Sequence, residues 1–450
     1  MKKIFIDCSY IVEHVELNTG IQRVVRRVVE TLSEIAPAHN VEIILVSIVN
    51  GEFQPLNLWQ LYPAEVEDAV ASVKLGVLGK AKQYVRDVYV SGRDFVDALC
   101  GHQRTIHQFL YAPRTQFGLS SFVYTPVNWI KRGIVKLDIN KKQQEQLTMF
   151  DAVSEGDTLL LLDSTWYADI WPSVELVRSR GASIVSIIYD LIPITHPQFC
   201  DDFLVEVFKD YFKTSTKYVD KYIAISNTVQ KDLEIFMLEN FGESAKRKNY
   251  DCFLLGSDFE TREKTQMARA DLARCFQSNS TYLIVSTVEP RKNHQYLLDA
   301  FDVLWGKGLK VSLCIIGRVG WKVEGLIERI ESHPQYNSQL FHFTNVDDDE
   351  LSFCYQNAKM LVFPSIIEGF GLPIVESLNY GLPVLASKTP VHQEVGGDHI
   401  GYFDLDFAES LANDIARIEL DGMPEEYRVP DNYKWMSWEE SSTMLLSKMQ

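Results

Sequence analysis

The sequence has no long uninterrupted apolar stretch. No run approaches the roughly 18 apolar residues of a membrane-spanning helix, so we expect no transmembrane segment. The N-terminal stretch MKKIFIDCSY has the lysines of a signal peptide, but its apolar run ends at Asp7, which favours a first strand over a leader.

Paired cysteines and an excess of basic residues are also missing. The seven cysteines are scattered without a CxxC pair, which argues against a disulfide framework or a structural zinc site and favours a reducing compartment. The formal net charge is −17, whereas a nucleic-acid-binding protein needs a basic face that neutralises phosphates. We therefore expect a cytoplasmic protein that binds no nucleic acid.

Short apolar runs alternate with helical-period segments along most of the chain. Apolar runs bounded by polar turns are typical of parallel strands buried on both faces, and they occur at 4–7, 41–49, 158–163, 183–190, 222–226, 282–287, 311–317, 340–343, 360–365 and 383–387. Helical periodicity lies between them at 20–35, 294–305 and 348–358. The alternation predicts an α/β protein with doubly wound sheets. Two sheets are expected because one compact sheet rarely carries so many strands.

The polar stretch around 240–260 separates the two expected sheets. We predict an N-terminal Rossmann-like domain over 1–245 and a C-terminal Rossmann-like domain over 246–425, followed by a last helix over 426–450 that packs back on the first domain. Ligands of such sheets bind at the carboxyl ends of the strands. Two domains facing each other would therefore place the site in a cleft between them.

Residues 52–150 do not follow the alternation, and we predict a mostly helical insertion in the first domain. Between 74 and 136 there are ten basic and three acidic residues. Two interpretations stay open: a solvated helical subdomain, or a surface that contacts anionic lipid headgroups or a lipid-linked acceptor.

The stretch PSIIEGFGLPIVES (364–377) carries the clearest chemical signal. A strand ends before it and a helix begins near Pro373, a residue that suits a first helical turn, so the loop lies at a sheet edge and a helix N-terminus, where phosphate binds. Gly369 and Gly371 allow the backbone to approach a ligand closely. Glu368 and Glu376 could accept hydrogen bonds from the hydroxyls of the two sugars of a nucleotide-sugar. The alternative is a loop with two solvated acids.

This stretch closely resembles the E-x7-E signature of retaining GT-B glycosyltransferases, above all of glycosyltransferase family four. The resemblance extends over 286–301, 315–321, 345–365 and 381–397, and more weakly over 19–26, 189–197 and 222–233. It implies a GT-B fold, in which the second domain binds a nucleotide-sugar donor and the first binds the acceptor.

The resemblance also implies residue roles in donor binding. Glu376 would bind the ribose hydroxyls, Glu368 the hydroxyls of the donor sugar, and Lys292 the diphosphate, whose charge grows as the glycosidic bond breaks. Thr287 stands where many relatives have an arginine, so Arg291 could supply the second positive charge. The donor-binding residues implied in this way are Gly20, Thr287, Arg291, Lys292, Gly317, Val346, Glu368, Gly369, Phe370, Gly371, Leu372 and Glu376.

The acceptor side is less defined. Tyr189 occupies the position where many family members have a histidine, so the group that contacts the acceptor hydroxyl stays open. Asp190 could accept the proton of that hydroxyl, or it could form a turn before Pro193. Asp163 either lines the acceptor side or caps a turn after its strand. The expected catalytic residues are Glu368, Lys292 and Asp190.

We expect no metal ion and no cofactor besides the nucleotide-sugar co-substrate. The run Asp347-Asp348-Asp349 has the spacing of a cation site, but aspartate before a helix is a capping preference. Lys292 and helix N-termini could neutralise the diphosphate without a metal.

The resemblance implies a retaining, metal-independent hexosyltransferase of surface-polysaccharide synthesis, acting on an O-antigen or capsule glycan that is growing or lipid-linked. GDP-mannose is the first choice of donor, followed by UDP-glucose-type donors and dTDP-rhamnose. We expect a cytoplasmic protein with a peripheral contact to the inner membrane face. Two alternatives stay open: a sugar-nucleotide epimerase or glycan phosphorylase of the same fold, and a non-catalytic scaffold.

Overall fold

The computed structural model describes residues 1–15, 19–62, 152–257 and 269–449. Residues 1–56 and 153–450 form one compact unit, and residues 57–152 form another. The predicted basic surface at 74–136 and most of the predicted insertion therefore lie outside the described residues.

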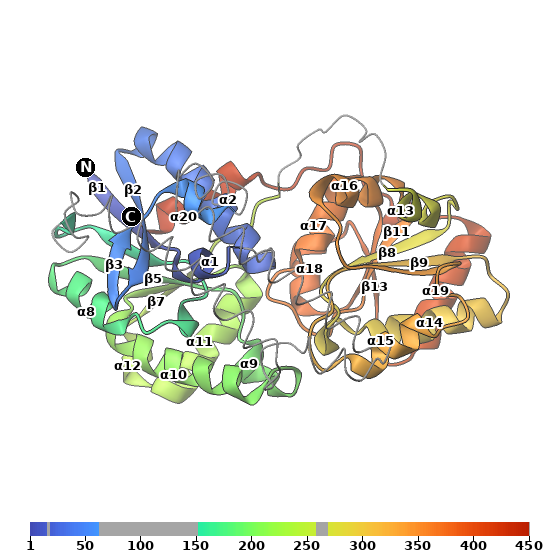
Figure 1. Cartoon of the computed structure of the whole chain (residues 1–450), viewed down its shortest axis with the longest axis horizontal. Coiled ribbons are helices and arrows are strands. Elements are labelled where there is room, and N and C mark those ends of the chain that lie inside the picture. The colour runs from blue at the N-terminus through green and yellow to red at the C-terminus, as the bar shows by residue number, and fades with distance from the viewer. Residues whose placement is uncertain (16–18, 63–151, 258–268, 450) are drawn as a thin grey trace, which may run out of the picture. The chain divides into compact units, whose positions relative to one another are not determined.

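The first sheet has seven strands in the order β3-β2-β1-β4-β5-β6-β7 and runs from blue to green in Figure 1. Every neighbouring pair is parallel except β2 and β3. The strands are β1 (Lys2–Asp7), β2 (Val41–Val49), β3 (Glu52–Pro55), β4 (Thr158–Leu161), β5 (Ser183–Ile188), β6 (Lys221–Ala224) and β7 (Asn249–Cys252).

The second sheet has six strands in the order β10-β9-β8-β11-β12-β13, all parallel, coloured yellow to red in Figure 1. Its strands are β8 (Thr281–Val285), β9 (Ser312–Ile316), β10 (Leu340–Phe343), β11 (Met360–Phe363), β12 (Val384–Ser387) and β13 (Gly401–Phe403). Two mostly parallel sheets with helices between their strands confirm the predicted α/β class.

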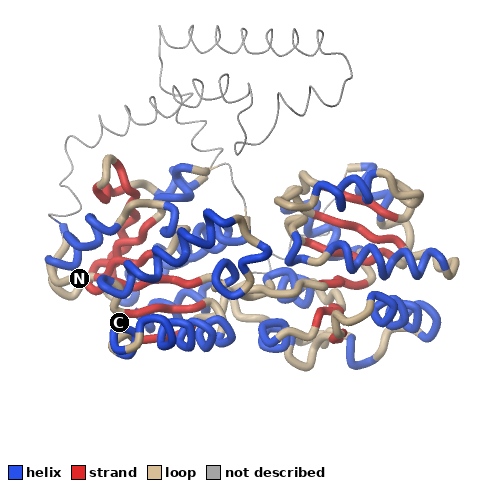
Figure 2. The backbone as a smooth tube through the Cα atoms, turned by 90° about the horizontal axis from the view of Figure 1, so that it is seen from below, coloured by secondary structure: helices blue, strands red, loops and turns tan. Residues whose placement is uncertain are grey.

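Helices flank the strands of both sheets (Figure 2). No helix of the described ranges is long and apolar enough to cross a bilayer. The α-helices are α1 (Ser9–Glu13), α2 (Gly20–Ile35), α8 (Trp171–Ser179), α9 (Ile192–Thr195), α10 (Asp202–Tyr218), α11 (Asn227–Phe241), α12 (Glu243–Lys246), α13 (Ala270–Cys275), α14 (His294–Gly306), α15 (Glu324–Glu331), α16 (Asp348–Asn357), α17 (Leu372–Asn379), α18 (Pro390–Gly396), α19 (Ala408–Asp421) and α20 (Trp438–Met449).

Three strands, β3, β7 and β13, fall where the sequence analysis expected none. Strand β3 occupies the start of the predicted insertion: Asn50 and Gly51 both have positive φ, of 55° and 84°, and turn the chain back into an antiparallel hairpin. Strand β7 lies inside the polar stretch taken as the domain break, and it pairs with β6. The first sheet thus extends to Cys252, beyond the boundary expected at 245.

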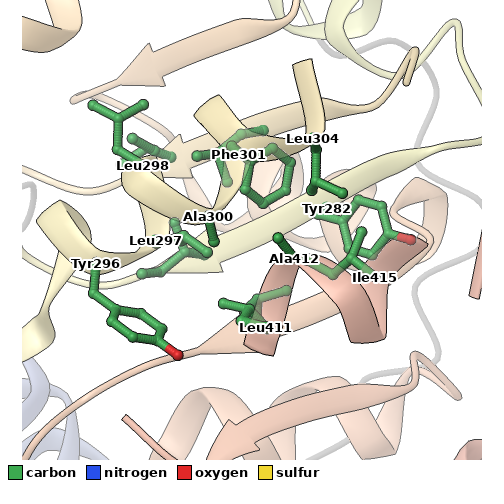
Figure 3. Close-up of a cluster of buried hydrophobic side chains, with 14 of the residues drawn as sticks. Tyr282, Tyr296, Leu297, Leu298, Ala300, Phe301, Leu304, Leu411, Ala412 and Ile415 are labelled. Atoms are coloured by element: carbon green, nitrogen blue, oxygen red, sulfur yellow. The ribbon is translucent and has the colours of Figure 1, made fainter. Parts of the chain in front are cut away.

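The core of the second sheet shows why its helices form. Leu297, Phe301 and Leu304 recur at helical spacing on α14 and are fully buried. They pack with α19 over Tyr282 of β8, as Figure 3 shows. The Tyr282 hydroxyl donates to Glu419 Oε1 at 2.6 Å, because a buried phenol needs a hydrogen-bond partner.

The last helix, α20, packs against α2 next to the first sheet. Trp438, Leu445 and Leu446 are buried on its apolar face. Lys448 Nζ lies 2.6 Å from Asp251 Oδ1 at the end of β7. The chain therefore returns to the first sheet after completing the second.

Candidate functional site

The loop between β11 and α17 depends on both glycines that the sequence singles out. Gly371 has φ of +106° at the N-terminal end of α17, a conformation that side chains disfavour. A Cβ atom at Gly369 would lie only 2.0 Å from the carbonyl oxygen of Tyr189. Ser226 Oγ also donates to the Gly369 carbonyl at 2.9 Å. The loop therefore lies directly against the chain that follows β5 and β6.

Glu368 stands between two cations from the loop after β8. Arg291 Nη1 donates to Glu368 Oε2 at 2.6 Å, and Lys292 Nζ is hydrogen-bonded to Glu368 Oε1. Only 7% of the Glu368 side chain is exposed. Burial raises its pKa, but the charges of Arg291 and Lys292 outweigh burial and hold the pKa well below its usual range. Glu368 is therefore ionised at neutral pH.

Two further carboxyl groups complete this cluster. Glu289, which is buried, accepts from Arg291 Nη2 at 2.6 Å. Asp190 accepts from the backbone N–H of Ile192 at 2.9 Å, which is the turn that the sequence allows. Burial raises the pKa of both Asp190 and Glu289, and the charge of Arg291 opposes this effect in both. The cluster thus combines three acids with two cations.

Burial also affects Lys292. Desolvation is the main cause that lowers the pKa of its ammonium group, and Arg291 adds to it, while Glu368 raises it. The low dielectric around the buried ammonium group strengthens its attraction to Glu368.

The second glutamate of the signature, Glu376, lies in α17 and has different partners. Arg23 Nη2, from α2, lies 2.8 Å from Glu376 Oε1. The hydroxyl of Tyr355, from α16, donates to Glu376 Oε2 at 2.7 Å. The two glutamates are therefore held separately, Glu368 by the loop after β8 and Glu376 by α2 and α16.

The remaining predicted donor residues lie in or beside the following elements. Gly20 begins α2, and among the described residues no heavy atom comes within 4 Å of a Cβ built there. Thr287 and Gly317 follow β8 and β9. Val346 precedes α16 and is partly buried. Leu372 is the first residue of α17. The Phe370 ring is buried and meets Trp435 edge to face at 6.1 Å between ring centroids.

Asp347 caps a helix, as the sequence analysis favoured. Its side chain accepts from the backbone N–H of Glu350 at 2.8 Å, at the start of α16. No group of three or more metal-ligating side chains that could hold an ion occurs within the described ranges.

On the first sheet, Asp163 binds backbone amides. It accepts from the N–H groups of Ile11 and Ser164 at 2.6 and 2.7 Å, so it holds the start of α1. Burial raises the pKa of Asp163 to about 6, and burial together with the charge of Asp163 raises the pKa of Asp7 to about 7. Tyr189 is also buried, and its hydroxyl donates to the Leu162 carbonyl at 2.8 Å.

The sequence analysis did not predict three of the contacts in the site. Glu289 pairs with Arg291, and both Arg23 and Tyr355 contact Glu376. Glu289 precedes the PRKN stretch and could have been found as its neighbour. Arg23 lies in the motif at 19–26, but its partner Glu376 is far along the chain. Tyr355 lies within the resembling stretch 345–365, but nothing in that stretch marks it as a partner of Glu376.

A solved structure has a similar fold. The crystal structure of Anabaena Alr3699/HepE in complex with UDP and glucose matches 100% of this chain and 95% of that chain, with a TM-score of 0.52 and 12% identity. At this identity the likeness shows the fold. Together with the two mostly parallel sheets, it defines an α/β GT-B fold.

Residues 276–434 match the family model described as Glycosyl transferases group 1. The matched segment spans β8 to β13 and contains Lys292, Glu368 and Glu376. The match and the fold support a glycosyltransferase.

Two curated relatives are mannosyltransferases. Over 369 residues the chain is 28% identical to the serotype-specific mannosyltransferase WbdA of Escherichia coli, covering 78% of this chain and 45% of WbdA. It is 24% identical over 249 residues to the O-antigen chain mannosyltransferase RfbU of Salmonella typhimurium, covering 55% of this chain and 63% of RfbU. The chain thus spans less than half the length of WbdA.

Proposed function

We propose that this chain is a retaining hexosyltransferase that moves mannose from GDP-mannose to a growing or lipid-linked surface glycan. The observation that carries the proposal is the pairing of Glu368 with Lys292 and Arg291 beside the close-packed Gly369. The names of WbdA and RfbU favour mannose and an O-antigen-type acceptor. The UDP named with the solved relative keeps UDP-sugars as second donors.

In the proposed reaction, Lys292 and Arg291 bind the donor diphosphate. Breaking the bond between the anomeric carbon and the diphosphate oxygen leaves negative charge on that oxygen. Cations already fixed in a buried site stabilise the developing charge without reorganisation. The same cations reduce the nucleophilicity of Glu368, which favours attack of the acceptor hydroxyl from the side of the leaving diphosphate over a covalent sugar–enzyme intermediate.

The acceptor hydroxyl must lose its proton as its oxygen bonds to the anomeric carbon. Asp190 is a candidate to take it, because burial raises its pKa and makes it a better base than an exposed aspartate. The leaving diphosphate is the other possible base. Asp190→Asn separates the two: a fall in kcat without a change in donor affinity assigns the proton transfer to Asp190.

The proposal is tested with a panel of nucleotide-sugars, measured by thermal stabilisation and by transfer to a mannose-containing oligosaccharide. Binding to the native state raises the melting temperature. We expect GDP-mannose to stabilise the protein most and to give a product with the donor's anomeric configuration by NMR. Release of free sugar without an acceptor would instead support an epimerase, and the absence of any stabilisation would support a scaffold.

Two further parts of the proposal need separate measurements. Metal independence requires that transfer persist in excess EDTA. Peripheral membrane contact through 74–136, which lies outside the described residues, requires co-flotation of the full chain with vesicles that contain anionic lipid, weakened by salt.

A further inference from the structure

Arg23 is a charged residue of the site that the proposed reaction does not use. It lies in the first turns of α2, and its guanidinium contacts Glu376 Oε1 at 2.8 Å. Tyr355 engages the other oxygen of the same carboxylate at 2.7 Å. Both oxygens of the glutamate that would bind ribose are therefore already engaged by protein groups.

The two partners of Glu376 differ in their freedom to move. Tyr355 is buried, and its ring stacks on Tyr380 with centroids 5.3 Å apart, so its hydroxyl is fixed. The Arg23 side chain is 40% exposed, whereas only 13% of the Glu376 side chain is exposed. Each carboxylate oxygen can still accept a second hydrogen bond, but ribose hydroxyls gain both acceptor positions of Oε1 only if the guanidinium of Arg23 moves away.

A released guanidinium has an anionic partner close by in the donor complex. The proposed function places the donor diphosphate at Lys292 and Arg291. The resemblance also implies donor binding at Gly20, and Arg23 lies one turn from Gly20 on the same helix. Guanidinium groups bind phosphate oxygens with two parallel hydrogen bonds. The diphosphate therefore replaces the carboxylate that the guanidinium loses.

We propose that Arg23 exchanges partners when a nucleoside diphosphate binds, from Glu376 to the diphosphate, so that the ribose gains access to Glu376. The exchange rests on the proposed function, because it concerns the same nucleotide site. Arg23 is thus a diphosphate-recognising residue that the first half of the chain contributes. It also lowers affinity for a nucleoside that has no phosphate, since such a ligand must displace Arg23 without compensation.

The test compares a nucleoside with its diphosphate in the Arg23→Ala variant. By calorimetry on the full chain, guanosine should bind several-fold more tightly than to the unchanged protein, and GDP several-fold more weakly. The ratio of the two Kd values should fall at least tenfold. Uridine and UDP form the second pair. Arg27→Ala is the matched control, because Arg27 pairs with Glu30 on its own helix, and it should leave both Kd values unchanged.

The outcomes separate this inference from the proposed function. Equal changes for guanosine and GDP, or none, would overturn the exchange while leaving a nucleotide site in place. If no nucleoside diphosphate binds the unchanged protein, both the proposed function and the exchange of partners by Arg23 are wrong. Arg23→Gln, which keeps a polar side chain without charge, should shift the ratio in the same direction and guards against misfolding of the alanine variant.

Discussion

Acidic side chains occur at the carboxyl edges of both sheets, but their surroundings differ. At the first edge, Asp163 accepts backbone N–H groups, and the pKa values of Asp7 and Asp163 are raised to about 7 and about 6, mainly by burial. At the second edge, Glu368 lies between Lys292 and Arg291 and keeps its charge. The same chemical group therefore orders the backbone in one place and holds two cations in the other.

The largest expected effect comes from removing a cation at the second edge. Lys292→Ala should lower kcat by about 10²- to 10³-fold, because one fixed charge at a developing anion contributes on that scale. Turnover with the identified donor is the measurement, with the melting temperature checked in parallel. Lys307→Ala, an exposed lysine of the same half, is the control. Turnover within a few-fold of the unchanged protein would remove Lys292 from the chemistry.

The loop between β11 and α17 lies so close to the chain after β5 that one added methyl group should disrupt the contact. Gly369→Ala places a Cβ 2.0 Å from the Tyr189 carbonyl oxygen, and such overpacking costs about 3 kcal/mol of unfolding free energy. Urea unfolding measures the loss. Gly325→Ala, in α15, is the matched control, since among the described residues no heavy atom lies within 4 Å of its added Cβ. Equal stability of the two variants would contradict the close approach.

The raised pKa of Asp7, at the edge of the first sheet, should make the free energy of unfolding depend on pH. Because the native pKa of Asp7 is about 7 and its usual value is 3.8, the native state keeps a proton that the unfolded state loses between these values. The free energy of unfolding therefore decreases as pH rises from about 4 to about 7. Asp7→Asn should reduce this decrease by about 3 kcal/mol.

Urea unfolding at several pH values between 4 and 7.5 measures this effect, with the exposed Asp398→Asn as the control. Glu368 should have the opposite effect on stability. Its pKa is lowered in the native state, so its ionised form stabilises the native state above its usual pKa of 4.5. This stabilisation is lost as the pH falls below 4.5. An unchanged pH profile in Asp7→Asn would show that Asp7 is ionised in the native state.

The strands that the sequence predicts well are those buried on both faces, because continuous apolar runs mark them. β7 was missed because its residues, NYDC, are polar and only partly buried. β13 was missed because it has three residues. β3 was missed although the Asn50-Gly51 pair that turns the chain is a recognised hairpin signal.

The site was predictable where its parts are close in sequence or share a motif. Glu368 and Lys292 were expected at one ligand, and the structure joins them directly. The pairing of Arg23 with Glu376 could not be predicted, because the two residues lie on helices that flank different sheets and are far apart in the sequence. The burial that raises the pKa of Asp190 likewise depends on tertiary packing, which no local pattern encodes.

The return of α20 to α2 also constrains how the molecule is made. During synthesis the residues of the first sheet leave the ribosome well before Leu445 and Leu446, which complete the apolar layer around α2. Until then the buried face of α2 stays partly uncovered, a state in which nascent domains are prone to aggregate. The first half therefore reaches its final packing only after the second half has emerged.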